Sequence, residues 1–106
     1  MMGPIKGVLK EELSNSRRMM KGYVRELAKL PKGSLVKKMI KGHEYYYLQV
    51  RNGKKVRFLY RGKVSETEIK KYQEAKKYRA KYRKLLSQTK KQIRFLMSSL
   101  RGKESI

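Results

Sequence analysis

The sequence of 106 residues contains no cysteine, no tryptophan and no aspartate, and its only histidine is His43. Without cysteine the chain has no disulfide, no thiolate nucleophile and no cysteine-based zinc or redox site, which suits a reducing compartment. Without aspartate, the acid-dependent chemistry of two-metal sites is not expected. We therefore predict no enzyme activity, no metal site and no cofactor.

Long apolar runs are also missing. No segment approaches the roughly 18 consecutive apolar residues of a membrane span. The first residues have only scattered apolar side chains before Glu11 and Glu12, unlike a signal peptide. An apolar content of 39% is enough for one modest core. These features predict a single small domain over residues 1–106 in the cytoplasm, associated with the nucleoid or another nucleoprotein and not with a membrane.

Positive charge is what the chain has in excess. Thirty Lys and Arg stand against eight acids, all glutamate, for a formal charge of +22. The charge is spread along the chain, with +5 (8 − 3) over residues 1–33, +8 (9 − 1) over 34–64 and +9 (13 − 4) over 65–106. Because this density of like charge opposes compaction, we expect a polyanionic partner, and nucleic acid is the first choice.

The first segment, residues 1–31, has the apolar spacing of a helix. The pattern predicts a helix from about Ile5 to Leu30 that ends at Pro31, since the residue before a proline disfavours the helical region. Ser16 interrupts its apolar stripe, which consists of Leu9, Leu13, Met20, Val24 and Leu27.

The middle segment, residues 34–62, contains three runs rich in β-branched and aromatic residues. Gly42 with His43 and Asn52 with Gly53 separate the runs, and an Asn-Gly pair favours a two-residue hairpin turn of type I′. These signals predict a three-stranded antiparallel meander. A turn at Asn52 and Gly53 would place Arg51 opposite Lys54, and therefore Tyr47 opposite Phe58.

This register divides the sheet into two faces, because opposed residues share a face. We call the first the aromatic face and expect it to be the core; it consists of Val36, Lys38, Ile40, Tyr45, Tyr47, Val56, Phe58 and Tyr60. We call the second the mixed face and expect it to be exposed; it consists of Leu35, Lys37, Met39, Tyr46, Leu48, Val50, Lys55, Arg57, Leu59 and Arg61.

The last segment predicts a long helix over residues 65–101. Ser65 and Glu68 have the spacing of a capping box, and no Pro or Gly follows before Gly102. We expect the part from Tyr72 to Tyr82 to cover the sheet. The second half is expected to pack on the N-terminal helix or on a second protomer, in a homodimer or a larger nucleoprotein complex, through Leu85, Ile93, Leu96 and Leu100.

The mixed face and the long helix together predict a nucleic-acid interface. Cations contact phosphates, and an arginine in the major groove can read guanine. On the sheet the candidates are Lys37, Lys55, Arg57, Arg61 and Tyr46. On the helix, which carries eleven cations and one acid between Lys70 and Arg94, they are Lys70, Lys71, Lys77, Lys81 and Lys84.

Three other features favour structural roles. Strand alternation assigns Tyr45 and Tyr47 to the core, which leaves Tyr46 as the candidate for stacking on a base. His43 is interpreted as a turn residue. Glu66 and Glu68 are explained by capping and the helix dipole.

The residues GSLVKKMIKGHEYYYLQVRNGKKVRFLYRGK resemble the sheet and following helix of arm-type DNA-binding domains of phage integrases. The resemblance covers about residues 33–85 and implies that the sheet enters the major groove, with Lys37, Lys55, Arg57 and Arg61 at the matching positions. The chain lacks any recombinase catalytic domain. It is also similar to small uncharacterised basic proteins of archaea, bacteria and mobile elements, in a GS…YYYL…Y.GK pattern before a charged helix.

Together these features predict a small α+β protein without enzyme activity that binds nucleic acid, with duplex DNA preferred. One alternative is an RNA-binding component of a ribonucleoprotein. Another is a phage or mobile-element accessory that acts on a host nucleoprotein complex, such as a CRISPR effector. A third is an RNA-cleaving toxin, which would arrest growth on expression.

Overall fold

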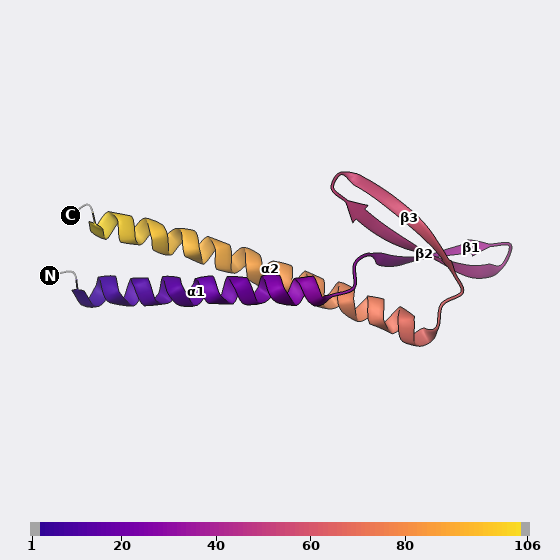
Figure 1. Cartoon of the computed structure of the whole chain (residues 1–106), viewed down its shortest axis with the longest axis horizontal. Coiled ribbons are helices and arrows are strands. Elements are labelled where there is room, and N and C mark those ends of the chain that lie inside the picture. Colours follow the sequence, from indigo (N-terminus) through magenta and orange to yellow (C-terminus); the bar gives the residue numbers. More distant parts are fainter. Residues whose placement is uncertain (1–2, 105–106) are drawn as a thin grey trace. The chain divides into compact units, whose positions relative to one another are not determined.

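The computed structural model describes residues 3–104, and the side chains of residues 5–102. Helix α1 (Gly3–Lys29) is followed by strands β1 (Ser34–Ile40), β2 (His43–Asn52) and β3 (Lys55–Gly62), and then by helix α2 (Glu66–Glu104) (Figure 1). The three strands form one antiparallel sheet in the order β1-β2-β3. The fold class is therefore α+β, as predicted, and α2 continues past Gly102.

The chain divides into two compact units. One combines α1 with α2 from Ala80 onward, and the other extends from Leu30 to Arg79 with the sheet and the beginning of α2. We call the first unit the helical hairpin, because its helices run side by side in opposite directions (Figure 1).

Within the helical hairpin, α1 turns one stripe of side chains inward. Residues on this stripe recur every three or four positions, which is the spacing of a coiled-coil seam. They are buried or half-buried: Leu9, Leu13, Ser16, Met20, Tyr23 and Leu27. Ser16 is not an interruption, since it is only 2% exposed. Val24, which was predicted on the stripe, is 51% exposed.

The seam on α2 has the same spacing. Its buried and half-buried members within the helical hairpin are Tyr82, Leu86, Thr89, Ile93, Leu96 and Leu100. The ring centroids of Tyr23 and Tyr82 are 6.1 Å apart, so the two rings meet across the seam. Tyr82 thus packs on α1 and not on the sheet, contrary to the prediction for the part of α2 up to this residue.

The seam also contains two small polar residues, one on each helix. Ser16 on α1 is 2% exposed and lies between Leu13 and Met20 on the stripe. Thr89 is 6% exposed, and its hydroxyl donates a hydrogen bond of 2.8 Å to the carbonyl of Leu85. The seam is therefore narrow and partly polar near its middle.

The residues expected to pack on the N-terminal helix or in a homodimer lie largely inside this hairpin. Ile93, Leu96 and Leu100 are between 5% and 9% exposed within the single chain, and Leu85 is half-buried. Packing between α1 and α2 accounts for these residues without a second protomer.

Both turns of the sheet lie one residue away from their predicted places. Ile40 pairs with His43 and Asn52 pairs with Lys55, so the turn residues are Lys41 with Gly42 and Gly53 with Lys54. Gly53 has a φ of 64° while Lys54 has no positive φ, as in a type II′ turn and unlike the predicted type I′ turn. His43 is consequently the first residue of β2 and not a turn residue.

The register therefore differs from the predicted one by two residues. Tyr47 lies opposite Tyr60 instead of Phe58. A shift of two residues leaves every side chain on its own face, because alternation along a strand has a period of two. The composition of the two faces is confirmed as far as Tyr60 on β3.

The prediction that the aromatic face is the core of the sheet is wrong. Leu48, at the centre of the mixed face, is 5% exposed, whereas Phe58 and Tyr60 on the aromatic face are 52% and 62% exposed. Alternation shows which residues share a face, but coverage depends on the segments that pack there. A Cβ atom added to Gly33 would lie 3.0 Å from the Leu48 side chain, so the chain before β1 closes on the mixed face.

The beginning of α2 is fixed by two contacts. The Ser65 hydroxyl accepts a hydrogen bond of 3.2 Å from the amide of Glu68, which confirms this half of the predicted capping box. One turn beyond the buried Ala75, the Arg79 guanidinium donates a hydrogen bond of 2.6 Å to the carbonyl of Pro31. Arg79 thereby connects α2 to the segment that leads into β1.

Candidate nucleic-acid interface

Four of the predicted sheet residues do lie on one face. The register places Lys37 beside Tyr46, and Lys55 and Arg57 on the same side of β3. Lys55 and Arg57 are exposed, and Tyr46 is half-buried. Lys37 forms an ion pair of 3.3 Å with Glu44, which lies on the same face, so its charge is partly neutralised. The mixed face thus presents less free charge than the sequence indicates.

Arg61 occupies an irregular position. Tyr47 pairs with Tyr60 and Tyr46 pairs with Gly62, so Arg61 is the extra residue of a β-bulge and has no partner opposite. Because a bulge interrupts the alternation of side chains along the strand, alternation no longer assigns Arg61 to the face of Lys55 and Arg57. The predicted group on the sheet is therefore reduced to two exposed cations and Tyr46.

Helix α2 keeps most of its charge on the surface. Of the eleven cations between Lys70 and Arg94, only Arg79 is half-buried and the other ten are exposed, including all five helix residues predicted for the site. None of the eleven forms an ion pair with another residue that the structure describes. The ammonium groups of Lys71 and Lys81 lie 5.9 and 5.8 Å from the ring centroids of Tyr72 and Tyr82. Free cations at this density attract a polyanion.

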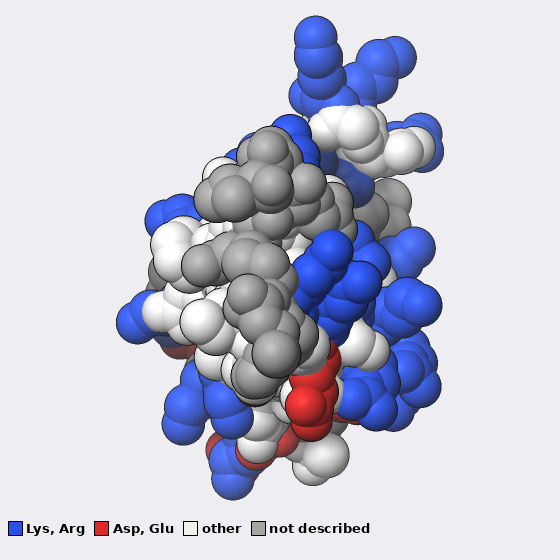
Figure 2. Space-filling model, turned by 90° about the vertical axis from the view of Figure 1, so that its left-hand side faces the viewer, with Lys and Arg blue, Asp and Glu red and all other residues white. Residues whose placement is uncertain are grey.

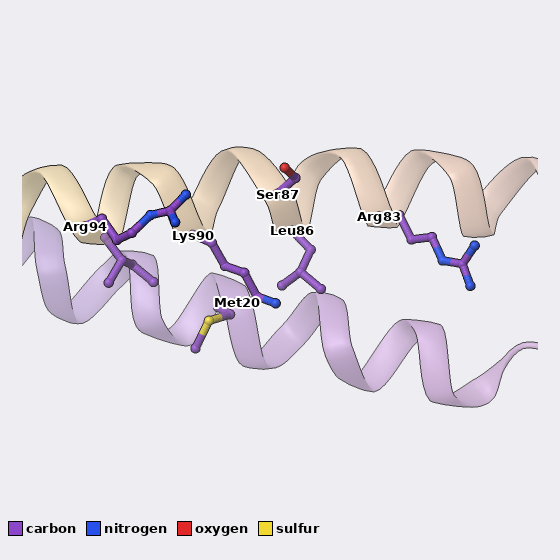
Figure 3. Close-up of a pocket in the computed structure, with 7 residues that line it drawn as sticks. Met20, Arg83, Leu86, Ser87, Lys90 and Arg94 are labelled. Carbon is purple, nitrogen blue, oxygen red and sulfur yellow. The ribbon is translucent and has the colours of Figure 1, made fainter. Parts of the chain in front are cut away.

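A groove of about 450 Å³ lies along α2 in the helical hairpin. Its apolar lining is Met20, Leu86 and Ile93, and its charged lining is Arg83, Lys90 and Arg94. Figure 3 shows Met20 on α1 near Lys90 of α2, with Leu86 next to them on the side toward Arg83 and Arg94 on the other side. The groove therefore has an apolar floor and a basic edge.

A second groove, of about 370 Å³, lies along α1. Leu13 and Ser14 line it together with four exposed cations, Lys10, Arg17, Arg18 and Lys21. Arg18 also donates a hydrogen bond to the side chain of Asn15. No acid lines either groove.

Both grooves open on the same side of the helical hairpin. Most groove cations directly follow seam residues, as Arg17 follows Ser16 on α1 and Arg83 follows Tyr82 on α2. One step along a helix turns the side chain by about 100°, and for two antiparallel helices that face each other this turn leads to the same side of the pair. We call this side the basic flank and define it by Lys10, Arg17, Lys21, Arg83, Lys90 and Arg94.

The sequence prediction missed the basic flank, because its candidates came from the sheet and from other cations of α2, and none came from α1. A signal was present: basic pairs recur every seven residues at Lys76–Lys77, Arg83–Lys84 and Lys90–Lys91. A seven-residue repeat keeps charges on one side of a helix, just as it keeps apolar residues on a seam. Figure 2 shows one face of the molecule, where Lys and Arg cover far more of the surface than Asp and Glu.

The described residues contain neither a metal-binding cluster nor a membrane-spanning helix. Between residues 3 and 104, no cluster of three or more His, Cys, Asp and Glu side chains is arranged to hold a metal ion. None of the described helical segments has the length and apolar character needed to span a membrane.

The fold and the interface define a class of protein: a small, strongly basic α+β chain with a three-stranded sheet between two long helices. The family model described as a domain of unknown function, DUF6788, matches residues 5–71, and the chain belongs to this family. The match includes the sheet and most of α1 but only the first residues of α2. No curated protein and no solved structure matches the chain. The similarity to a group of uncharacterised proteins is thus confirmed, and the resemblance to integrase arm-type domains stays a prediction.

Proposed function

We propose that this protein binds nucleic acid, with duplex DNA as the preferred ligand, and acts without catalysing a reaction. The observation that carries the proposal is the basic flank, where two helices present six exposed cations around grooves that no acid lines. Lys55 and Arg57 on the mixed face provide a second group of phosphate contacts.

The spacing of the basic flank suits a phosphate backbone. Arg83 and Lys90 are seven residues apart, which is about 10.5 Å along a helix at 1.5 Å per residue. A duplex presents a negative charge about every 1.7 Å along its axis, so each cation has several phosphates within reach. Contacts of this kind fix orientation but do not read sequence, and we therefore expect weak sequence preference.

Two variants that remove the same charge from different places test the proposal. One replaces Arg83, Lys90 and Arg94 with glutamine, and its matched control replaces Lys55, Arg57 and Arg61. Binding to a labelled 20-base-pair duplex is measured by fluorescence anisotropy at several salt concentrations. If the flank contacts phosphates, its variant reduces the slope of log affinity against log salt by about 2.7, because each lost contact contributes about 0.9.

The outcomes separate the function from its location. The sheet control should reduce the slope by about 1.8 at most if Lys55 and Arg57 each contact one phosphate. Equal effects of the two triple variants would show that the flank is not the principal contact surface. Absence of salt-dependent binding by the unmodified protein would refute the function itself. Competition with duplex RNA tests the preference for DNA, because A-form geometry presents a different groove to the protein.

A further inference from the structure

The aromatic face of the sheet is the largest feature that phosphate binding leaves unexplained. Phe58 and Tyr60 are 52% and 62% exposed, and Val56 and Ile40 on the same face are 39% and 43% exposed. These four large side chains are exposed together on one face. Grouped exposure of this kind marks binding surfaces, whereas single exposed apolar residues are common. Since the mixed face contains the buried Leu48, these rings are not the core of the sheet.

The rings form a contiguous cluster. The centroid of Tyr60 lies 5.4 Å from that of Tyr47 and 6.3 Å from that of Tyr45, so one exposed ring rests between two half-buried ones. Phe58 and Tyr60 are two residues apart on β3, which places them about 6.8 Å apart along the strand. The neighbouring strand supports the exposed rings, which therefore lose little conformational freedom on binding.

Positive charge borders the same cluster. The Lys38 ammonium lies 4.8 Å from the centroid of Tyr47 and 5.6 Å from that of Phe58. The register also puts the exposed Arg51 on this face, opposite Val56. No acid lies on the face, because Glu44, the only acid of the three strands, belongs to the mixed face. The face thus combines exposed rings with cations and without acids.

We propose that the aromatic face is a stacking platform for the unpaired bases of a single-stranded nucleic acid, with Phe58 and Tyr60 under the bases and Lys38 and Arg51 on the phosphates. The proposal rests on the proposed function in that the ligand is a nucleic acid, but it assigns a second site and a second form of that ligand. Aromatic rings and cations together are the combination that holds single strands, because every base has a π-face and every nucleotide a negative charge.

The charge on the face argues against a second copy of the sheet as its occupant. Two copies would bring the Lys38 and Arg51 charges of both chains to one interface with no acid to neutralise them. Like charges brought together across an interface oppose association. A single strand, in contrast, supplies the opposite charge. A dimer through this face is accordingly an outcome that would overturn the proposal.

The test replaces the exposed rings and measures two ligands in parallel. The variant Phe58→Leu with Tyr60→Leu keeps an apolar surface but removes the π-faces, and the matched control Leu59→Ala alters a side chain 48% exposed on the opposite face of the same strand. Affinity for a labelled 15-nucleotide single strand should fall between about fivefold and a hundredfold in the leucine variant and change little in the control. Affinity for duplex DNA should be unchanged in both.

A fluorescence signal gives a direct reading of stacking. The chain has no tryptophan, so Phe58→Trp introduces a unique probe. A base stacked on the indole should quench its emission on addition of the single strand, and duplex should quench it much less. Circular dichroism establishes that each variant is folded before binding is measured.

Each outcome has one meaning. Loss of single-strand binding with intact duplex binding supports the platform. Unchanged single-strand affinity in the folded leucine variant, or a unique tryptophan that is not quenched, refutes the platform while the proposed function stands. A change from dimer to monomer in the leucine variant, measured by analytical ultracentrifugation, would assign the face to self-association instead. No binding of either ligand by the unmodified protein would refute both proposals.

Discussion

The helical hairpin buries its apolar side chains, whereas the sheet leaves several of its apolar side chains exposed. In the hairpin, Ile93, Leu96 and Leu100 are less than 10% exposed, and cations occupy the outer sides. In the sheet only Leu48 is buried to this degree, while Phe58 and Tyr60 are more than half exposed. A seam between two helices can bury a narrow stripe completely, whereas a sheet needs a layer over each face. We therefore expect the hairpin to depend on its seam for stability and the sheet to use its open face for binding.

A cavity in the seam should have the largest effect, and it tests whether the hairpin depends on its buried side chains for stability. Leu96→Ala removes a side chain that is 5% exposed and should destabilise the protein by about 2–5 kcal/mol, the usual cost of deleting a buried leucine. Chemical denaturation followed by circular dichroism measures the loss. The adjacent Phe95→Ala is the control, because Phe95 is 68% exposed and its removal should change stability by less than about 0.5 kcal/mol. A similar loss for both variants would show that burial in the seam does not determine stability.

The corresponding test of the sheet is Gly33→Ala. Gly33 has a φ of 96°, and a Cβ atom there would lie 2.9 Å from the carbonyl oxygen of Gln49. The substitution should cost about 1–3 kcal/mol through backbone strain, and the close contact adds to this cost. Gly53→Ala is the control for backbone strain alone, since its φ is 64° but nothing lies within 4 Å of the added atom. Hydrogen exchange should show faster opening of β1 and β2 in Gly33→Ala than in Gly53→Ala. Equal rates would contradict the close approach.

The smallest expected effect concerns the beginning of α2, shortly after the end of β3. Ser65→Ala removes the hydroxyl that accepts from the Glu68 amide and should cost about 1 kcal/mol, the typical value of an N-cap. Thermal unfolding measures the change, and Thr67→Ala, in the same helical turn, is the control. If the two substitutions lower the melting temperature equally, the cap contributes nothing specific.

Much of the fold could be predicted because its signals are local. Pro31, the Gly-containing turns and the Ser65 cap mark the ends of elements, and each acts within a few residues of its place. The faces of the sheet were also predictable despite the wrong turns. A displacement by an even number of residues cannot exchange the faces.

The remainder depends on contacts between distant segments. Ser16 is polar and resembles a break in the stripe, but it is small and is buried in the seam. Nothing local distinguishes a buried sheet face from an open one, and the more apolar face was wrongly predicted to be the core. The basic flank combines residues up to 84 positions apart (94 − 10), so it exists only once the two helices are paired.

The buried Ser16 and Thr89 have a further consequence for the hairpin. Two helices joined by a repeating seam could slide past each other by seven residues and still meet apolar side chain with apolar side chain. Such a slip would move these two small side chains, which are 2% and 6% exposed, against neighbours of other sizes and would leave voids in the seam. The two small residues therefore favour one alignment of the helices over its alternatives. That alignment keeps Lys10, Arg17 and Lys21 at a constant offset from Arg83, Lys90 and Arg94.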